Sequence, residues 1–217
     1  MRNKNLLVKS IHNPEELNLH DVLKSGYKYA KKEKNSTSNV EKHGYVLDKG
    51  LSNHNHQTYY NKTQNKLLFN VNGTHNASDW ITDVKLGLGF LGSGLLGAKN
   101  PFGIGFKESD RYKQSHKALR DAKTKYSVDN AVVTGHSLGH AVASGISSKN
   151  DKVMTLDGAY TLGQKTRPNT THYRTQGDLV SSLSSGKNTV TLQNPNGQQG
   201  FIKAHNIDNI KGQKIII

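Results

Sequence analysis

Hydrophobic positions in the first third of this 217-residue chain change from helical to strand-like spacing. The sequence NPEE at 13–16 holds residues that favour a helix start, and apolar residues then recur at helical intervals. We therefore predict an N-terminal helix and a polar connector within residues 1–43. Runs at 44–48, 56–61 and 66–72 are strand-like and separated by turn-forming residues, which predicts an antiparallel start to a sheet.

The second half of the chain alternates between helical and strand-like patterns. A polar helix is predicted from about Ser109 to Tyr126. The strand-like runs that follow it lie at 130–135, 152–157, 171–176 and 188–193. Such alternation is typical of the crossover units of a parallel sheet. We predict a single α/β domain over residues 1–217, with a mainly parallel central sheet, antiparallel N-terminal strands and helices on both faces.

Composition narrows the class of protein. Only 33% of the residues are hydrophobic, and the absence of cysteine excludes a disulfide scaffold and a thiolate metal site. The chain contains neither 18 consecutive apolar residues nor a signal-peptide core. We therefore expect a cytoplasmic or particle-associated protein rather than one secreted by the usual route, with its oligomeric state left open.

Charge is the strongest compositional signal. Thirty basic residues against 16 acidic ones give a formal net charge of +14. This excess favours encounters with polyanions, including peripheral contact with an anionic membrane surface. The lysines are spread along the chain without zinc-finger spacing or an aromatic-interleaved basic motif, so we predict no specific nucleic-acid binding.

A glycine-rich apolar segment occupies about residues 86–106. Its glycines disfavour a core helix, whereas its Leu, Phe and Ile residues are unusual for a plain flexible loop. We interpret it as a lid or interfacial patch, flanked by Lys85, Lys99 and Lys107 as an anionic lipid surface would favour. A buried glycine-rich hairpin is the alternative.

The sequence VVTGHSLGHAVASG at 132–145 places a serine between two glycines, after a predicted strand and before a small-residue helix. This arrangement predicts a nucleophile elbow, in which Ser137 is held on a sharp turn above the sheet edge. Positions 135 and 139 require glycine because the strand and helix backbones pass close together there. The elbow also directs the backbone N–H of Leu138 toward a developing oxyanion.

A serine hydroxyl needs a base, and the base needs an acid that orients it. In the fold that contains a nucleophile elbow, the serine comes first in the chain, the acid (Asp or Glu) second and the histidine last. Among the later histidines we favour His205, in a loop beyond the last predicted strand, over His140 and His172.

Two aspartates compete for the role of the acid. Asp178 follows a predicted strand through a glycine turn, and Asp157 ends the strand before it. We favour Asp178 because it lies closer to the base in sequence and its glycine turn is able to lift it over the sheet edge.

These residues resemble the class 3 lipases of the α/β-hydrolase superfamily over roughly residues 44–207. The block NVNGTHNASDWITD at 70–83 is similar to the family's Arg-Gly-Thr strand end and Asp-Trp helix, and VVTGHSLGHAVA to its Gly-His-Ser-Leu-Gly-Gly elbow. HYRTQGDLVSSL is similar to the family's acid block, and AHNI lies where its histidine is found. The resemblance implies an α/β-hydrolase fold and an oxyanion hole to which Thr74 contributes together with Leu138.

The chain departs from the family pattern at three positions. Asn72 stands where the family carries arginine, His140 where it carries a second glycine, and Leu179 where proline often follows the acid. None of these changes removes a reacting group. They indicate that the chain would be a divergent member of the family it resembles.

We therefore predict a serine hydrolase of lipid esters, of the triacylglycerol lipase or phospholipase A1 kind, that acts through an acyl-enzyme. The catalytic residues are Ser137, Asp178 and His205, and no metal or organic cofactor is required. The HNH sequence at 54–56 lacks further ligands at zinc-site spacing. The alternative function is a membrane- or particle-associated binding protein that keeps the fold without turnover.

Overall fold

A computed structural model of the chain describes residues 16–73, 109–158, 168–182, 188–195 and 201–217. Within these residues one seven-stranded sheet runs in the order β1-β2-β3-β4-β5-β6-β7. The strands are β1 (Val46–Leu47), β2 (His56–Asn61), β3 (Lys66–Val71), β4 (Val132–His136), β5 (Lys152–Leu156), β6 (Thr170–Thr175) and β7 (Thr189–Leu192). β1, β2 and β3 pair antiparallel, and β3 to β7 pair in parallel. The predicted α/β sheet is thus confirmed.

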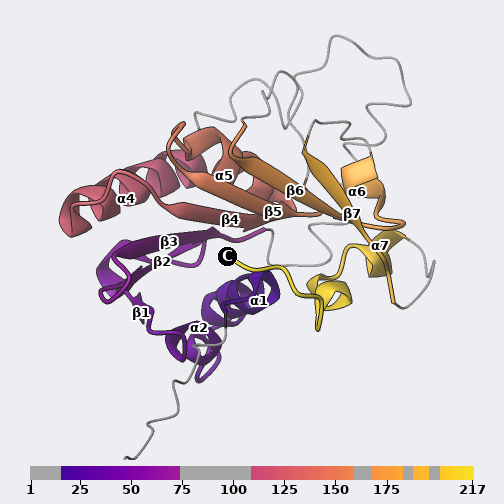
Figure 1. Cartoon of the computed structure of the whole chain (residues 1–217), viewed down its shortest axis with the longest axis horizontal. Coiled ribbons are helices and arrows are strands. Elements are labelled where there is room, and N and C mark those ends of the chain that lie inside the picture. The colour runs from indigo at the N-terminus through magenta and orange to yellow at the C-terminus, as the bar shows by residue number, and fades with distance from the viewer. Residues whose placement is uncertain (1–15, 74–108, 159–167, 183–187, 196–200) are drawn as a thin grey trace, which may run out of the picture.

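Helices cover both faces of this sheet, as Figure 1 shows. They are α1 (Leu19–Ala30), α2 (Ser38–Glu41), α4 (Asp110–Tyr126), α5 (Leu138–Ile146), α6 (Leu179–Ser182) and α7 (Phe201–Ala204), with the 3₁₀ turns η1 (Lys49–Leu51) and η3 (Ile207–Ile210). α4 and α5 lie on one face, and α1 and α2 lie on the other. None of the helices in the described part of the chain is long and apolar enough to cross a membrane.

The N-terminal helix begins later than the sequence predicted. Glu16 and Leu17 are not helical, and α1 starts at Leu19. The cap is Asn18, whose side-chain oxygen accepts a hydrogen bond from the His20 amide at 3.0 Å. Residues 1–15, including most of the NPEE sequence, lie outside the described part of the chain. Asn18 has a second anchor, since its side-chain amide donates to the carbonyl of Gln213 near the C-terminus at 2.7 Å.

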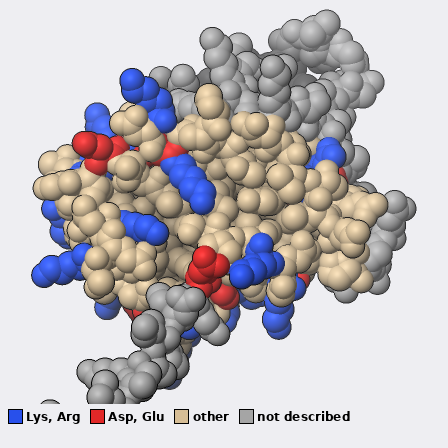
Figure 2. Space-filling model, in the orientation of Figure 1, with Lys and Arg blue, Asp and Glu red and all other residues tan. Residues whose placement is uncertain are grey.

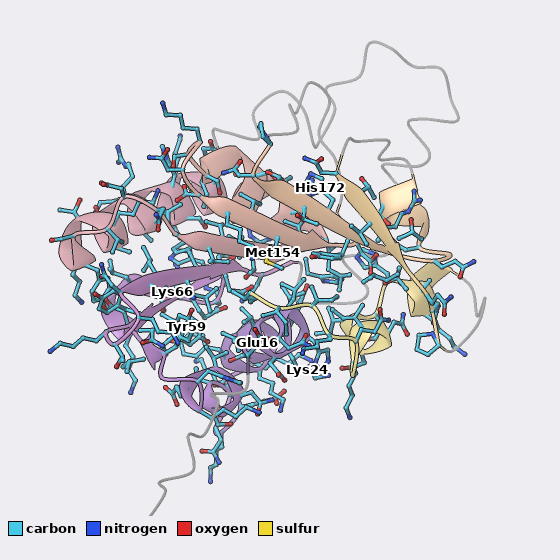
Figure 3. The ribbon with its side chains drawn as sticks, viewed as in Figure 1. Glu16, Lys24, Tyr59, Lys66, Met154 and His172 are labelled. Carbon is cyan, nitrogen blue, oxygen red and sulfur yellow. The ribbon has the colours of Figure 1, made fainter. Side chains whose placement is uncertain are left out.

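Alternating strand residues supply the cores on the two faces. On β3, Phe69 packs with the α4 and α5 side chains, whereas Leu68 packs with Val22 of α1 on the opposite face. On β5, Val153 belongs to the α5 face and Met154 to the α1 face, where it is marked in Figure 3. Because both faces are buried, the central strands contain near-continuous apolar runs.

The parallel strands all end at the same edge of the sheet. β4 ends beside Ser137, β5 ends before Asp157, and β6 ends before the turn that carries Asp178. Residues that are far apart in the sequence therefore meet at the carboxyl edge of the strands, which is where open α/β sheets bind their ligands.

Candidate active site

Ser137 occupies the tight turn between β4 and α5 that the sequence identified as an elbow. Its backbone has φ 56° and ψ −126°, an uncommon conformation for a residue with a side chain. The residue is 3% exposed, and its side chain does not cap α5. The hydroxyl is therefore held at the end of β4, next to the N-terminus of a helix whose dipole favours negative charge.

The glycines of the motif are required by close backbone approach. A Cβ on Gly135 would lie 2.5 Å from the carbonyl oxygen of Gly139. A Cβ on Gly139 would lie 2.8 Å from the carbonyl oxygen of Asn72, just beyond β3. Real Cβ atoms do not tolerate such distances, so each position excludes every other residue, as the sequence predicted.

Asp178 and His205 are in direct contact. Nδ1 of His205 lies 2.8 Å from Oδ1 of Asp178, and both residues are buried. Oδ2 of Asp178 accepts hydrogen bonds from the amide and the hydroxyl of Ser181 in α6. Burial opposes ionisation, but the hydrogen bonds from His205 and Ser181 lower the pKa of Asp178 below its usual value. The carboxylate therefore remains ionised and directs Nδ1–H of His205 toward itself.

His136, immediately before Ser137, connects this pair to the N-terminal helix. Its Nε2 lies 3.1 Å from the carbonyl oxygen of His205, which only accepts, so Nε2 carries the proton. Its Nδ1 then accepts from the hydroxyl of Tyr27 in α1 at 2.8 Å. Burial and the neighbouring His205 lower the pKa of His136 to about 3, so the ring is neutral. His136 thus holds the segment that carries His205.

Asp157 belongs to the same cluster but has different hydrogen bonds. Its two carboxylate oxygens accept from the amide and the hydroxyl of Thr175, at 2.6 and 2.8 Å. Burial, reinforced by the charge of Asp178, raises the pKa of Asp157 to about 7. Two buried carboxyl groups close together do not readily ionise at the same time, and Asp178 is the one stabilised by His205.

His136, Asp157 and His205 are also the one group of three metal-ligating side chains found within the described residues, with ligand atoms within 4.8 Å of one another. The ligand atoms of His136 and Asp157 already have hydrogen bonds. Both nitrogens of His136 are engaged, and both oxygens of Asp157 accept from Thr175. A cation at this place would have to break these contacts, so the cluster is better suited to holding protons than a metal.

The residues around the predicted oxyanion hole are described only in part. Leu138 is the first residue of α5, as the elbow requires. Thr74 and the segment 86–106 lie outside the described residues. Gly73 precedes Thr74 and lies against the elbow, because a Cβ at Gly73 would be 3.2 Å from Cβ of Ser137.

Asn72, the first departure from the family pattern, is tied into a buried polar network. Its side-chain amide donates to the carbonyl oxygens of His54 and Gly26, at 2.8 and 3.2 Å. Its side-chain oxygen accepts from Asn70 at 2.9 Å. The asparagine therefore connects the end of β3 to α1. The guanidinium near this position comes instead from Arg111 of α4, whose Nη2 donates to the Asn72 carbonyl at 2.8 Å.

His140, the second departure, belongs to another histidine cluster. Its Nδ1 and Nδ1 of His172 each lie 2.8 Å from the hydroxyl of Thr155, and the two rings are 4.5 Å apart between centroids. One hydroxyl donates to one ring and accepts from the other, so the two neutral rings hold opposite tautomers. Burial lowers the pKa of His172 to about 4, and burial with the neighbouring His172 places that of His140 well below its usual value.

Tyr27 and Arg111 are the functional candidates that sequence reasoning missed. Tyr27 lies 109 residues before its partner His136, and Arg111 lies 39 residues after Asn72. Neither residue stands in a local motif, and Arg111 is one of 30 basic residues. Only the folded arrangement brings them to the elbow.

Comparison with known proteins finds one family model that matches part of the chain. The family model for Lipase (class 3) matches residues 68–152, a range that includes Ser137 and ends before Asp178 and His205. The chain is similar to the crystal structure of Lip2 lipase from Yarrowia lipolytica, with a TM-score of 0.53 and 18% identity over 80% of this chain and 76% of that one. No curated protein matches the chain by sequence.

A second similar structure is the Rhizomucor miehei lipase in complex with its propeptide, with a TM-score of 0.51 and 14% identity. The alignment covers 77% of this chain and 61% of that one, so the chain spans about three fifths of that lipase. At these identities the likeness establishes the shared α/β-hydrolase fold.

Proposed function

We propose that this chain is a serine hydrolase of carboxylic esters and a divergent relative of the class 3 lipases, on the family match over residues 68–152 and the shared fold. The observation that carries the proposal is the contact between Asp178 and His205 at the sheet edge where the elbow presents Ser137. A buried carboxylate that orients a histidine near a serine on a strained turn is the arrangement that serine activation requires.

The reaction would proceed in two steps. Oγ of Ser137 attacks the ester carbonyl carbon, and Nε2 of His205 takes its proton, since Nδ1 is engaged by Asp178. His205 then gives that proton to the departing alkoxide, so the alcohol leaves and the acyl group remains on Ser137. A water molecule deprotonated by His205 next attacks the acyl carbon, the bond to Oγ of Ser137 breaks, and His205 returns the proton to Oγ as the carboxylic acid is released. No cofactor enters either step.

The negative charge that develops on the carbonyl oxygen needs donors that are already in place. The amide of Leu138, at the N-terminus of α5, is one proposed donor. Thr74 is the other, on the family resemblance and on the position of Gly73 beside Ser137. Together these two groups would form the oxyanion hole.

We propose lipid esters, of the triacylglycerol or phospholipid A1 type, as the substrates, with an anionic surface as the site of encounter. The support is the net charge of +14 and the apolar segment 86–106. Figure 2 shows Lys and Arg side chains scattered over the visible face, with fewer Asp and Glu among them. Binding to anionic vesicles should weaken as salt rises, because the charges are screened over about 8–10 Å at ordinary ionic strength. Equal, salt-independent binding to neutral vesicles would contradict this.

A fluorophosphonate probe and a series of chromogenic esters of increasing chain length test the proposal. Ser137→Ala should abolish both labelling and turnover, because it removes the nucleophile. Ser144→Ala is the matched control: Ser144 lies in α5, close in sequence, and its buried Oγ has no hydrogen-bond partner among the described residues. Its rates should equal those of the wild type. Wild-type protein that is neither labelled nor active would instead favour the binding protein without turnover.

A further inference from the structure

Arg111, the second residue of α4, reaches back to the chain that precedes the predicted oxyanion residue. Its Nη2 donates to the carbonyl oxygens of Asn72 and Gly73, each at 2.8 Å. Its Nε is buried without a hydrogen-bond partner, and no carboxylate within the described residues forms an ion pair with it. Burial lowers the pKa of the guanidinium, which nevertheless remains charged in proteins.

Gly73 is held from its other side by Tyr27. The backbone N–H of Gly73 donates to the Tyr27 hydroxyl, which in turn donates to Nδ1 of His136. That hydroxyl occupies the space that a Cβ at position 73 would need, and the carbonyl oxygen of His136 would be 2.8 Å from such an atom. Both backbone polar groups of Gly73 therefore have partners, Arg111 for the carbonyl and Tyr27 for the amide.

The carbonyl of Gly73 belongs to the same peptide group as the amide of residue 74. A peptide group is planar and nearly always trans, so its N–H points opposite to its C=O. Fixing the direction of the Gly73 carbonyl therefore fixes the direction of the next N–H. Residue 74, to which the proposed function assigns an oxyanion donor, lies outside the described residues, and the contact that the structure shows is the one from Arg111 to the Gly73 carbonyl.

We infer that Arg111 is a positioning residue for the oxyanion hole, acting through the Gly73 carbonyl. Its charge would add a second effect, since a partly buried cation near the elbow stabilises negative charge on the substrate oxygen. The inference rests on the proposed function, and it assigns to α4 a part in the reaction that neither the family motif nor the local sequence contains.

The expected effect follows from what oxyanion donors contribute. Loss of one such donor lowers kcat by roughly 10²–10³-fold. Misdirecting the donor rather than deleting it should cost about 10–100-fold in kcat. KM should change little, because the oxyanion hole binds the transition state more strongly than the ester.

The experiment compares Arg111→Met with Arg111→Lys and with Arg120→Met, an exposed arginine on the same helix. Arg111→Met should lower kcat and weaken the binding of an alkyl boronic acid, a tetrahedral mimic, by similar factors. Arg111→Lys keeps the charge and hydrogen-bond donors and should recover part of both losses. Arg120→Met should match the wild type. Thermal unfolding of each variant reports on the fold.

Three outcomes would overturn the inference. One is a folded Arg111→Met with wild-type kcat and boronic acid affinity. Another is a lowered unfolding temperature with both quantities unchanged, which would make Arg111 structural only. The third is that the wild-type protein shows no ester turnover that Ser137→Ala abolishes. This result would overturn the proposed function as well. If Arg111→Met does not fold, Arg111→Gln takes its place. It removes the charge but keeps a donor amide, so its losses should be smaller than those expected for Arg111→Met and still measurable against Arg120→Met.

Discussion

Ser137 lies between two histidine clusters that differ in the groups around them. On the side of His136, the ring centroids of His136 and His205 are 4.7 Å apart, and the carboxylate of Asp178 contacts His205 directly. On the side of His140, the partner is His172, joined through the Thr155 hydroxyl, and its position on β6 is marked in Figure 3. The two clusters contain the same residue type at similar burial.

The difference shows what a buried histidine needs in order to work as a base. In water an imidazole takes up a proton near neutral pH, but burial alone penalises the charged form. Burial lowers the pKa of His172 to about 4, and that ring stays neutral. His205 is equally enclosed, yet Asp178 lies 2.8 Å from its Nδ1 and provides the charge that stabilises an imidazolium. We therefore propose proton transfer for the first cluster and packing for the second.

The largest expected effect comes from removing the carboxylate that distinguishes the first cluster. Asp178→Asn should lower kcat by about 10³–10⁴-fold, as such a change does in a Ser-His-Asp triad, because His205 would adopt the wrong tautomer. The control is Asp157→Asn, which changes the neighbouring carboxyl group that accepts from Thr175. Its kcat should fall less than about tenfold, since Nδ1 of His205 keeps its partner.

Both variants are measured on one soluble ester, with circular dichroism to confirm folding. A larger loss in folded Asp157→Asn would transfer the role of the acid to the residue after β5. Equal, small losses in both variants would mean that the two clusters do not differ in the way proposed.

The sequence predicted much of this arrangement because the signals are local. The strand-like runs at 56–61 and 66–72 lie between turn-forming residues, and the structure has strands at His56–Asn61 and Lys66–Val71. The elbow requires glycines at 135 and 139, and the structure shows that no side chain fits at either position. Chain order limited the acid and the base to residues after Ser137, and the glycine turn and the loop position favoured Asp178 and His205, which do lie in contact.

The parts that could not be predicted depend on contacts between distant segments. Tyr27 meets His136 across 109 residues, and no short pattern in α1 indicates such a partner. The capping sequence at 13–16 predicts a helix start there, whereas α1 begins after Asn18. The side chain of Asn18 also donates a hydrogen bond to the carbonyl of the distant Gln213. Tertiary contacts of this kind outweigh local preference.

The smaller expected effect concerns the second cluster and appears in stability rather than in turnover. An unfolded histidine takes up a proton below about pH 6.5, whereas folded His172 resists protonation until about pH 4. Between these values the unfolded chain binds more protons, so the free energy of unfolding falls as pH falls. Each such group contributes a slope of up to about 1.4 kcal/mol per pH unit.

His172→Gln removes this titration while keeping a side chain able to hydrogen-bond Thr155. Urea unfolding at pH 6.5 and 5 should show the wild type losing about 1–2 kcal/mol more than the variant over this interval. Asp157, with its pKa raised to about 7, acts in the opposite direction, because the folded state then binds the extra proton. That contribution is common to both proteins and cancels in the difference. Identical losses in wild type and His172→Gln would mean that the second cluster accepts protons in the folded state, and the contrast between the two sides of Ser137 would disappear.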